Sequence, residues 1–203
     1  MPVGKAVPAM FDLLRSHILS RIDLSDEEFT RCTAFFIPRK LRKRQFLLQE
    51  GEVCRSIAFV VKGCLRCYSV DDKGEEHIIQ FAIEDWWISD PYSMLTGEPT
   101  EYNIDALEAS ELLLLEKHSE EKLLKEIPRF ERLFRLLLEN RFVANQRRIN
   151  AALSISAEER YLGFLKAYPA IAQRVPQSQI ASYLGITPQS LSRIRKEISG
   201  KKQ

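Results

Sequence analysis

The chain has 203 residues, of which 45% are hydrophobic and 29% charged, and its formal net charge at pH 7 is +2. This length suits one large domain or two small ones, and the composition is that of a globular protein. No apolar run approaches the roughly 20 residues that span a bilayer, and charged or polar residues interrupt any signal-peptide core near the start. We therefore expect a cytoplasmic protein that has no membrane partner.

The first segment is predicted to be helical. Residues 10–19 carry a short apolar stripe, and Ser25 to Glu28 match a capping box that opens a second helix through Phe35, which Pro38 closes. The basic stretch at residues 39–45 could form a nucleic-acid patch or the solvent face of a strand and turn. Apolar residues flank it on both sides, which favours the strand and turn.

Residues 46–116 are predicted to form short β-strands separated by turns. We expect strands at 46–48, 57–61, 65–70, 77–83, 102–107 and 111–115, with turn residues between them. A spacing of roughly ten residues between strands indicates an antiparallel barrel or roll rather than a βαβ sheet.

The four cysteines are Cys32, Cys54, Cys64 and Cys67, and the last two form a C-x-x-C. The surrounding segment is predicted to be a strand, in which residues three apart point to opposite faces with Cα atoms roughly 10 Å apart. This separation excludes a local disulfide and disfavours joint metal binding. We interpret the cysteines as structural, with a redox or cluster-binding role as the alternative, and expect no metal site.

Residues 122–153 are predicted to form one long helix. Its apolar face is broader than one small domain needs, which indicates a partner helix, although packing on its own β domain is the alternative. We expect a homodimer whose interface includes Phe130, Phe134, Leu137, Leu138 and Phe142. A break at residues 154–156 predicts the boundary between an effector domain at 1–153 and a DNA-binding domain at 154–203.

Residues 176–198 fit a helix-turn-helix, with an ordinary helical hairpin as the alternative. Gly185 can adopt the left-handed conformation that ends the first helix. Thr187 can cap the second helix, and Pro188 suits its first position. Residues 154–203 contain eight Lys and Arg against three Glu, a net charge of +5, which favours contact with DNA phosphates. The predicted DNA-binding residues are Gln177, Ser178, Thr187, Gln189, Ser190, Ser192, Arg193 and Lys196.

An antiparallel roll, a long helix and a helix-turn-helix, in this order, resemble the Crp/Fnr family of bacterial transcription regulators. The matching residues include Gly51, Gly63 and Gly74 in turns, and the core of the second helix at residues 190–194. The resemblance implies an α+β fold with a cyclic-nucleotide-binding-like roll, flanking helices, a connecting dimer helix and a small helical DNA-binding domain. It also implies a homodimer on a two-fold operator in double-stranded DNA, with RNA polymerase as a further partner.

The chain departs from the cyclic-nucleotide-binding members, which carry a Gly-Glu-Leu segment followed by a phosphate-binding arginine. Here no arginine lies between Arg66 and Arg129, and a phosphate would meet acidic side chains at residues 85–101. This argues against cyclic AMP, so we expect an unknown effector and no cofactor. The predicted effector pocket comprises Trp86, Trp87, Ser89, Asp90 and Tyr102, with core and rim packing as the alternative.

We expect no enzymatic activity, because the three histidines are scattered and no catalytic motif is present. The remaining alternative to a DNA-binding regulator is an effector-binding or redox-sensing β-roll module with little or no DNA binding.

Overall fold

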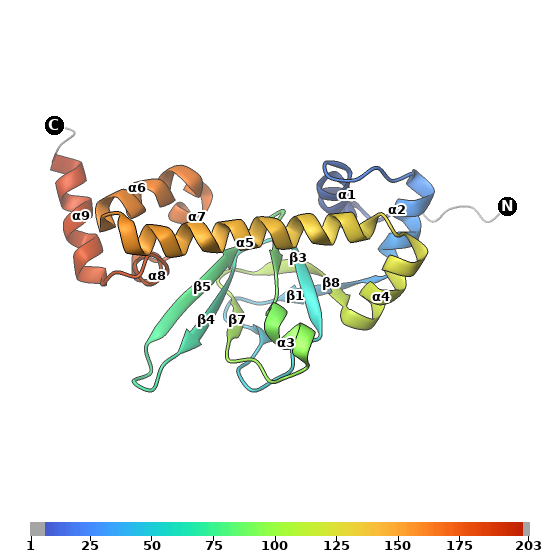
Figure 1. Cartoon of the computed structure of the whole chain (residues 1–203), viewed down its shortest axis with the longest axis horizontal. Coiled ribbons are helices and arrows are strands. Elements are labelled where there is room, and N and C mark those ends of the chain that lie inside the picture. Colours follow the sequence, from blue (N-terminus) through green and yellow to red (C-terminus); the bar gives the residue numbers. More distant parts are fainter. Residues whose placement is uncertain (1–6, 201–203) are drawn as a thin grey trace. The chain divides into compact units, whose positions relative to one another are not determined.

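The structure, a computed structural model, describes residues 7–200 (Figure 1). It opens with a short 3-10 turn, Ala9–Phe11, followed by helices α1 (Asp12–Leu19) and α2 (Asp26–Thr33). The predicted capping box is confirmed, because the Ser25 hydroxyl accepts from the Glu28 N–H and the Glu28 carboxylate accepts from the Ser25 N–H. This reciprocal pair satisfies two N–H groups that the first turn leaves unpaired.

Pro38 does not close α2, contrary to the prediction. The helix ends at Thr33, and Pro38 lies inside strand β1 (Phe36–Leu41). β1 is the edge strand of a sheet ordered β1-β8-β3-β6, where a residue that cannot donate a hydrogen bond is tolerated. The basic stretch at residues 39–45 occupies β1 and the turn to β2 (Phe46–Leu48), with its Lys and Arg side chains exposed. The strand-and-turn interpretation is thus confirmed.

The predicted antiparallel roll is confirmed. Its other strands are β3 (Ser56–Lys62), β4 (Leu65–Val70), β5 (Glu76–Ala82), β6 (Trp87–Ile88), β7 (Asn103–Ala106) and β8 (Ser110–Glu116). β8 pairs antiparallel with both β1 and β3, β6 pairs with β3, and the second sheet is ordered β2-β7-β4-β5. The short strand β6 and helix α3 (Pro91–Thr96) were not predicted.

Three local signals mark α3, even though the helix is too short to show a hydrophobic period. Asp90 caps it by accepting a hydrogen bond from the Tyr92 N–H, and Pro91 occupies its first position. Gly97 ends it in the left-handed conformation, with φ +78°.

By compactness the chain divides into two units. One contains the chain up to Leu65 together with Ala82–Leu138, and the other contains Arg66–Phe81 together with the chain from Glu139 onward. The division therefore crosses the long helix and groups the β4–β5 hairpin with the C-terminal helices. The domain boundary at residues 153 and 154 stays a prediction.

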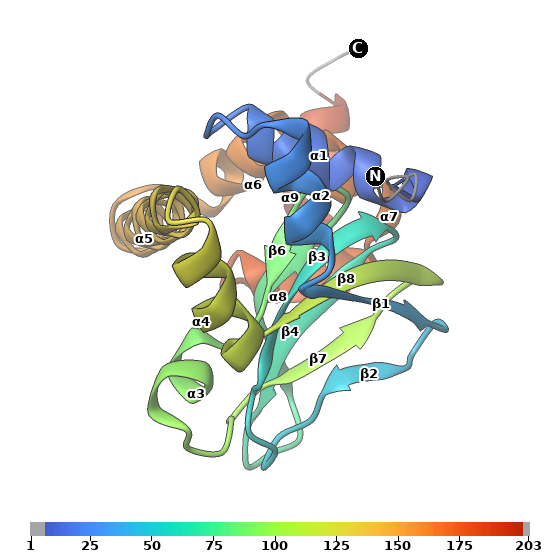
Figure 2. The same ribbon diagram turned by 90° about the vertical axis from the view of Figure 1, so that its right-hand side faces the viewer.

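The core of the first unit lies between its helices and the sheet that contains β3 and β8. In Figure 2, α1 and α2 lie over one end of β3. Its fully buried residues include Leu14, Ile18, Cys32, Phe59, Leu113, Leu115, Leu123, Phe130 and Leu133. Apolar side chains from the beginning and the end of this unit's sequence thus pack in one hydrophobic core, and this packing holds the helices against the sheet that contains β3 and β8.

The predicted helix at residues 122–153 is two helices, α4 (Lys117–Glu126) and α5 (Phe130–Ser154). Pro128 explains the break, because proline lacks an N–H and disfavours helical geometry in the residue before it. Ile127 accordingly has φ −134° and ψ 79° and lies buried in the core.

Up to residue 200, where the described part ends, four helices follow α5: α6 (Ala157–Ala167), α7 (Pro169–Arg174), α8 (Gln177–Tyr183) and α9 (Pro188–Gly200). Ser156 and Glu159 form a second capping box at the start of α6. Among the described residues, no helix combines the length and apolarity needed to cross a membrane.

Candidate DNA-binding and effector sites

The turn between α8 and α9 has the geometry that the sequence predicted. Gly185 adopts φ +67°, and the Ile186 N–H donates to the Ala181 carbonyl over 3.0 Å. The Thr187 hydroxyl accepts from the Ser190 N–H over 3.1 Å, so Thr187 caps α9. These local bonds fix how α9 leaves α8.

The second helix of this pair has one buried face and one exposed face. Leu191 is buried, and Ile194 and Ile198 are half-buried on the same side. The exposed side carries four of the predicted DNA-binding residues, which are Gln189, Ser192, Arg193 and Lys196. Their spacing of three, four and seven residues along the chain places them together on one helical face. This face, called the α9 polar face below, combines hydrogen-bonding and cationic groups.

The other predicted DNA-binding residues are placed differently. The Thr187 and Ser190 hydroxyls lie 2.9 Å apart and hydrogen-bond to each other at the helix start. Gln177 is half-buried, whereas Ser178 is exposed on α8. The basic residues Lys201 and Lys202 lie outside the described residues.

Helix α8 also contacts strand β5 within the second unit, which the sequence did not predict. The Ser182 hydroxyl donates to the Glu76 carbonyl and accepts from the Ile78 N–H, each over 2.9 Å. The ring of Tyr183 lies 5.5 Å from that of Phe81. No local pattern could reveal this contact, because the paired residues are more than 100 positions apart.

Arg148 of α5 also contacts strand β5 of the β4–β5 hairpin. Its guanidinium donates to the Ile79 carbonyl over 2.7 Å and lies over the Tyr183 ring at 5.2 Å. Burial raises the pKa of the Tyr183 hydroxyl, and Tyr168 adds to this while Arg148 opposes it. Tyr183 therefore stays a neutral packing group at physiological pH.

A cleft of about 350 Å³ lies in the first unit, between the strands of the roll. Its lining residues are Leu47, Leu48, Glu52, Val53, Cys54, Arg55, Ser56, Ile88, Ser89 and Ile104. Five of these ten residues are aliphatic, but most of the exposed cleft surface is polar, and the lining includes one carboxylate and one guanidinium residue. A volume of this size falls within the range of small-molecule sites.

Of the five residues predicted to line an effector pocket, only Ser89 lines this cleft. Trp87 instead packs against the core, with its ring 5.0 Å from that of Phe59. The buried Asp90 accepts from the Thr100 hydroxyl over 2.6 Å and caps α3. Trp86 and Tyr102 are half-buried outside the cleft lining. Successive residues of a strand point to opposite faces, so Ile88 lines the cleft whereas its neighbour Trp87 points away from it.

Two of the acidic residues that were expected to repel a phosphate have partners outside the cleft. Asp85 pairs with His17 over 2.8 Å, and Glu98 accepts from the Tyr92 hydroxyl over 2.7 Å. The cleft takes its charges from Glu52 and Arg55 instead. Arg55 precedes Arg66 in the chain, so it lies outside the arginine-free segment between Arg66 and Arg129.

The apolar face predicted for dimerisation divides along α5. Phe130 is fully buried in its own core, so it has no surface to offer a second chain, and Phe134 and Leu137 pack against that core. Beyond them, large apolar side chains are exposed: Leu138 (58%), Phe142 (64%), Val143 (45%), Ile149 (52%) and Leu153 (82%). Four of these, Leu138, Phe142, Ile149 and Leu153, recur at near-heptad spacing and are called the α5 stripe below.

All four cysteines are buried, and Cys64 lies in the turn before β4 rather than in a strand. Burial raises the pKa of the Cys32 thiol to about 12. A thiol held in its protonated form is a poor nucleophile and a poor metal ligand.

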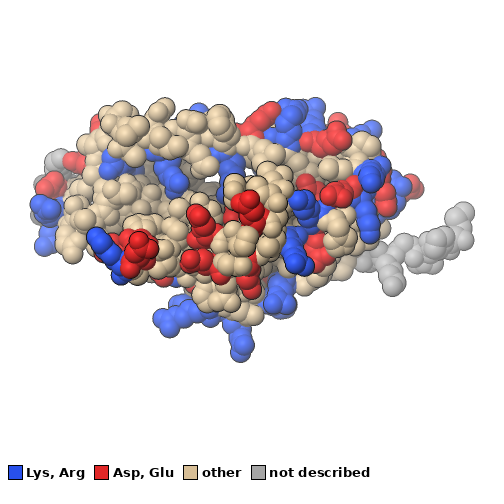
Figure 3. Space-filling view, turned by 60° about the horizontal axis from the view of Figure 1, so that its bottom comes forward, with Lys and Arg blue, Asp and Glu red and all other residues tan. Residues whose placement is uncertain are grey.

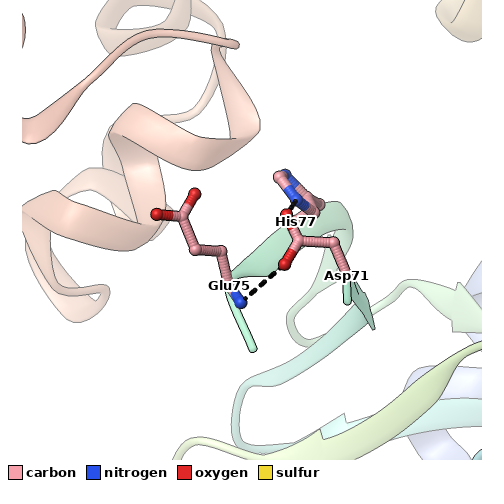
Figure 4. A group of neighbouring side chains, drawn as sticks. All are labelled: Asp71, Glu75 and His77. Carbon is pink, nitrogen blue, oxygen red and sulfur yellow. Dashed lines mark hydrogen bonds and ion pairs between the residues drawn. The ribbon is translucent and has the colours of Figure 1, made fainter. Parts of the chain in front are cut away.

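Asp71, Glu75 and His77 lie together at the tip of the β4–β5 hairpin (Figure 4). One Asp71 oxygen accepts from the Lys73 and Glu75 N–H groups, and the other lies 2.9 Å from His77 Nε2. These bonds lower the pKa of the Asp71 carboxyl, with the His77 contact contributing most. All three side chains are exposed, and their mutual hydrogen bonds account for the turn.

Charge is mixed over much of the surface. On the face viewed in Figure 3, Lys and Arg are interspersed with Asp and Glu and with uncharged residues. This agrees with the small net charge of +2 and gives that face no uniform field of one sign.

Comparisons with known proteins agree with this architecture. The cyclic nucleotide-binding domain family matches residues 38–126. The regulatory protein HlyX of Actinobacillus pleuropneumoniae is 25% identical over 183 residues, which cover 84% of this chain and 75% of that protein. The transcriptional activator protein anr of Pseudomonas aeruginosa is 27% identical over 172 residues, which cover 77% and 68%.

Solved structures show the same fold. FixK2 from Bradyrhizobium japonicum superposes with a TM-score of 0.72 at 18% identity, covering 82% of this chain and 86% of that one. The catabolite activator protein of Thermus thermophilus gives a TM-score of 0.56 at 17% identity, covering 95% and 87%. A cyclic-nucleotide-binding-type roll followed by a helix-turn-helix defines a class of transcription regulators. Within that class, these similarities support a regulator of the Crp/Fnr family.

Proposed function

We propose that this chain binds double-stranded DNA as a homodimer, reads a specific operator through α9, and responds to an effector other than a cyclic nucleotide. The α9 polar face carries this proposal, because it is exposed, spans two helical turns and combines an amide, a hydroxyl and two cations. A helix of this composition can enter the major groove, where each base pair presents a distinct pattern of donors and acceptors. RNA polymerase is a further partner in this proposal, and a cytoplasmic location follows from the need to reach DNA.

Each side chain of the α9 polar face has a role in this proposal. Arg193 is exposed one turn into the helix and reads guanine through a bidentate hydrogen bond. Gln189 and Ser192 contact neighbouring base edges, and Lys196 contacts a phosphate. Thr187 and Ser190 support the reading face by capping the helix.

Selection from random oligonucleotides, followed by affinity measurements on the selected operator, tests this assignment. Arg193→Ala is expected to weaken binding by about 1–3 kcal/mol per half-site, which is about 5- to 150-fold, and to relax specificity at one base pair. Arg195→Ala is the matched control, since Arg195 is exposed on the opposite flank of the same helix. The Arg195→Ala protein is expected to retain its base preference. An operator preference that survives Arg193→Ala would contradict the assignment.

We place the effector in the cleft of the roll. Leu47, Leu48, Ile88 and Ile104 supply aliphatic side chains, while most of the exposed cleft surface is polar, with Glu52 and Arg55 at the same cleft. Such a lining favours a ligand that is largely polar and has a smaller apolar part. Operator selection with and without candidate small molecules would test whether a ligand acts on DNA binding.

The redox-sensing alternative is the weaker proposal. All four thiols are buried, and the raised pKa of Cys32 keeps that thiol protonated at physiological pH. Reactive cysteines are accessible and carry a lowered pKa instead.

A further inference from the structure

His17 of α1 has no role in DNA binding or in the effector cleft, yet it is buried to 4% exposure and uses both ring nitrogens. Nδ1 lies 2.8 Å from an Asp85 carboxylate oxygen, and Nε2 lies 2.9 Å from the indole nitrogen of Trp87. Asp85 and Trp87 follow β5 in the chain, about 70 residues from His17. The imidazole therefore ties the N-terminal helix to the roll.

Hydrogen-bond chemistry fixes the protonation state of this imidazole. An indole N–H can only donate, so Nε2 of His17 must be the acceptor and carry no proton. A carboxylate can only accept, so Nδ1 must carry the proton. The neutral Nδ1–H tautomer is thus the one state that satisfies both contacts. A second proton on Nε2 would face the Trp87 N–H and break that hydrogen bond.

The surroundings oppose the charged form at neutral pH. Burial lowers the pKa of His17 below its ordinary value of 6.5, and Arg21 adds to this, whereas the hydrogen bond and charge of Asp85 oppose it. Two aromatic rings also pack near the imidazole, with the Phe59 ring 5.2 Å and the Trp87 ring 5.9 Å away. Asp85 and Arg21 are the charged groups that face His17.

Trp87 connects this contact to the effector cleft. It forms β6 with Ile88, and these two residues pair with Phe59 and Ala58 of β3. Ile88 and the next residue, Ser89, line the cleft. Trp87 is therefore joined by a single peptide bond to Ile88 in the cleft wall.

We propose that His17, Asp85 and Trp87 form a proton-sensitive latch that fastens α1 to β6, and that protonation of His17 releases Trp87 and loosens the adjacent cleft wall. The latch operates without DNA or effector, so its failure would leave the proposed DNA binding untouched.

The sign of the pH effect follows from proton linkage. Because the folded pKa of His17 is lowered, the unfolded chain takes up the proton first as pH falls. The stability that the latch contributes is fully present above about pH 6.5 and is lost as pH falls from there through the folded pKa. Below the folded pKa no further loss arises from this group.

Fluorescence of Trp87 tests the latch in the full chain. The sequence has two tryptophans, so Trp86→Phe leaves Trp87 as the sole reporter. We expect a one-proton transition with a midpoint below pH 6.5, together with faster amide exchange at Ile88 and Ser89 on its acidic side. His17→Gln, which cannot titrate, is expected to abolish both changes. His118→Gln, at an exposed histidine of α4, is the matched control and is expected to retain them.

Two further variants separate a latch from simple packing. Trp87→Phe keeps an aromatic ring but removes the opposing donor, so the midpoint of the His17 imidazole in an NMR titration is expected to rise. Asp85→Asn removes the charge that favours the imidazolium, so the midpoint is expected to fall. Midpoints that move in the same direction, or not at all, would overturn the latch.

A last test uses the unaltered chain, so it does not depend on whether a variant folds. Nitrogen NMR of the His17 ring at pH 7.5 is expected to show an unprotonated Nε2 and a protonated Nδ1. A proton found on Nε2 would refute the proposal directly.

Discussion

Phe142→Asp is expected to separate the proposed dimer into monomers. Phe142 is 64% exposed at the centre of the α5 stripe. A phenylalanine side chain buries about 150–250 Å², so about 100–150 Å² per protomer is available to a partner. At about 25 cal/mol per Å² this is about 3 kcal/mol per protomer and about 6 kcal/mol per two-fold dimer. Losing it would raise the dimer dissociation constant by about 10⁴-fold, before the cost of burying the new carboxylate.

Sedimentation equilibrium measures the outcome. Ala144→Asp is the matched control, because Ala144 is exposed on the same helix, two residues along, on the side away from the stripe. It introduces the same charge and is expected to leave the dimer mass unchanged. A Phe142→Asp protein that keeps the mass of a dimer would refute the stripe as the interface, as would an equal effect of both variants.

Two further predictions concern the roll. Gly63→Ala places a Cβ 2.2 Å from the Ser110 hydroxyl and 2.7 Å from its Cα, at φ +109°. It is expected to cost about 2–4 kcal/mol of unfolding free energy, from overpacking plus an unfavourable φ. Gly74 has φ +79° and open space around the position of a Cβ, so Gly74→Ala is expected to lower the free energy of unfolding by only about 1 kcal/mol. Urea titrations that show equal losses for the two variants would contradict the predicted clash at Gly63. Calorimetry with cyclic AMP or cyclic GMP is expected to show no heat, because no arginine follows Arg66 before Arg129, and micromolar binding would assign Arg55 as a replacement cation.

The helix-turn-helix could be predicted almost residue by residue because its determinants are local. Gly185, Thr187 and Pro188 each act through the backbone of their own turn, and the structure gives each the predicted conformation or bond. The inward and outward faces of α9 follow from helical periodicity alone. The strands of the roll were predicted for the same reason, from alternating apolar runs and turn residues.

The predictions that were wrong rest on local sequence patterns that fit two different structures. Pro38 fits either the end of a helix or an edge strand, and only strand order places it at an edge. The apolar face at residues 130–153 reads as one surface, yet Phe130 is buried in its own core and Phe142 is exposed. Periodicity reports which residues share a face, and it does not report what covers that face.

The sequence by itself determined the order of elements, the turn chemistry of α8 and α9, and the family resemblance, because each depends on neighbours within a few residues. Tertiary structure alone decided three contacts. It placed Trp87 against His17, Ser182 against β5, and Arg55 in the cleft. These pairings join segments far apart in the chain, and each depends on how the strands close into a roll and which helices cover it. The strands close into a roll because this buries the hydrophobic core as a whole. Sequence patterns that extend over a few residues therefore cannot predict the closure.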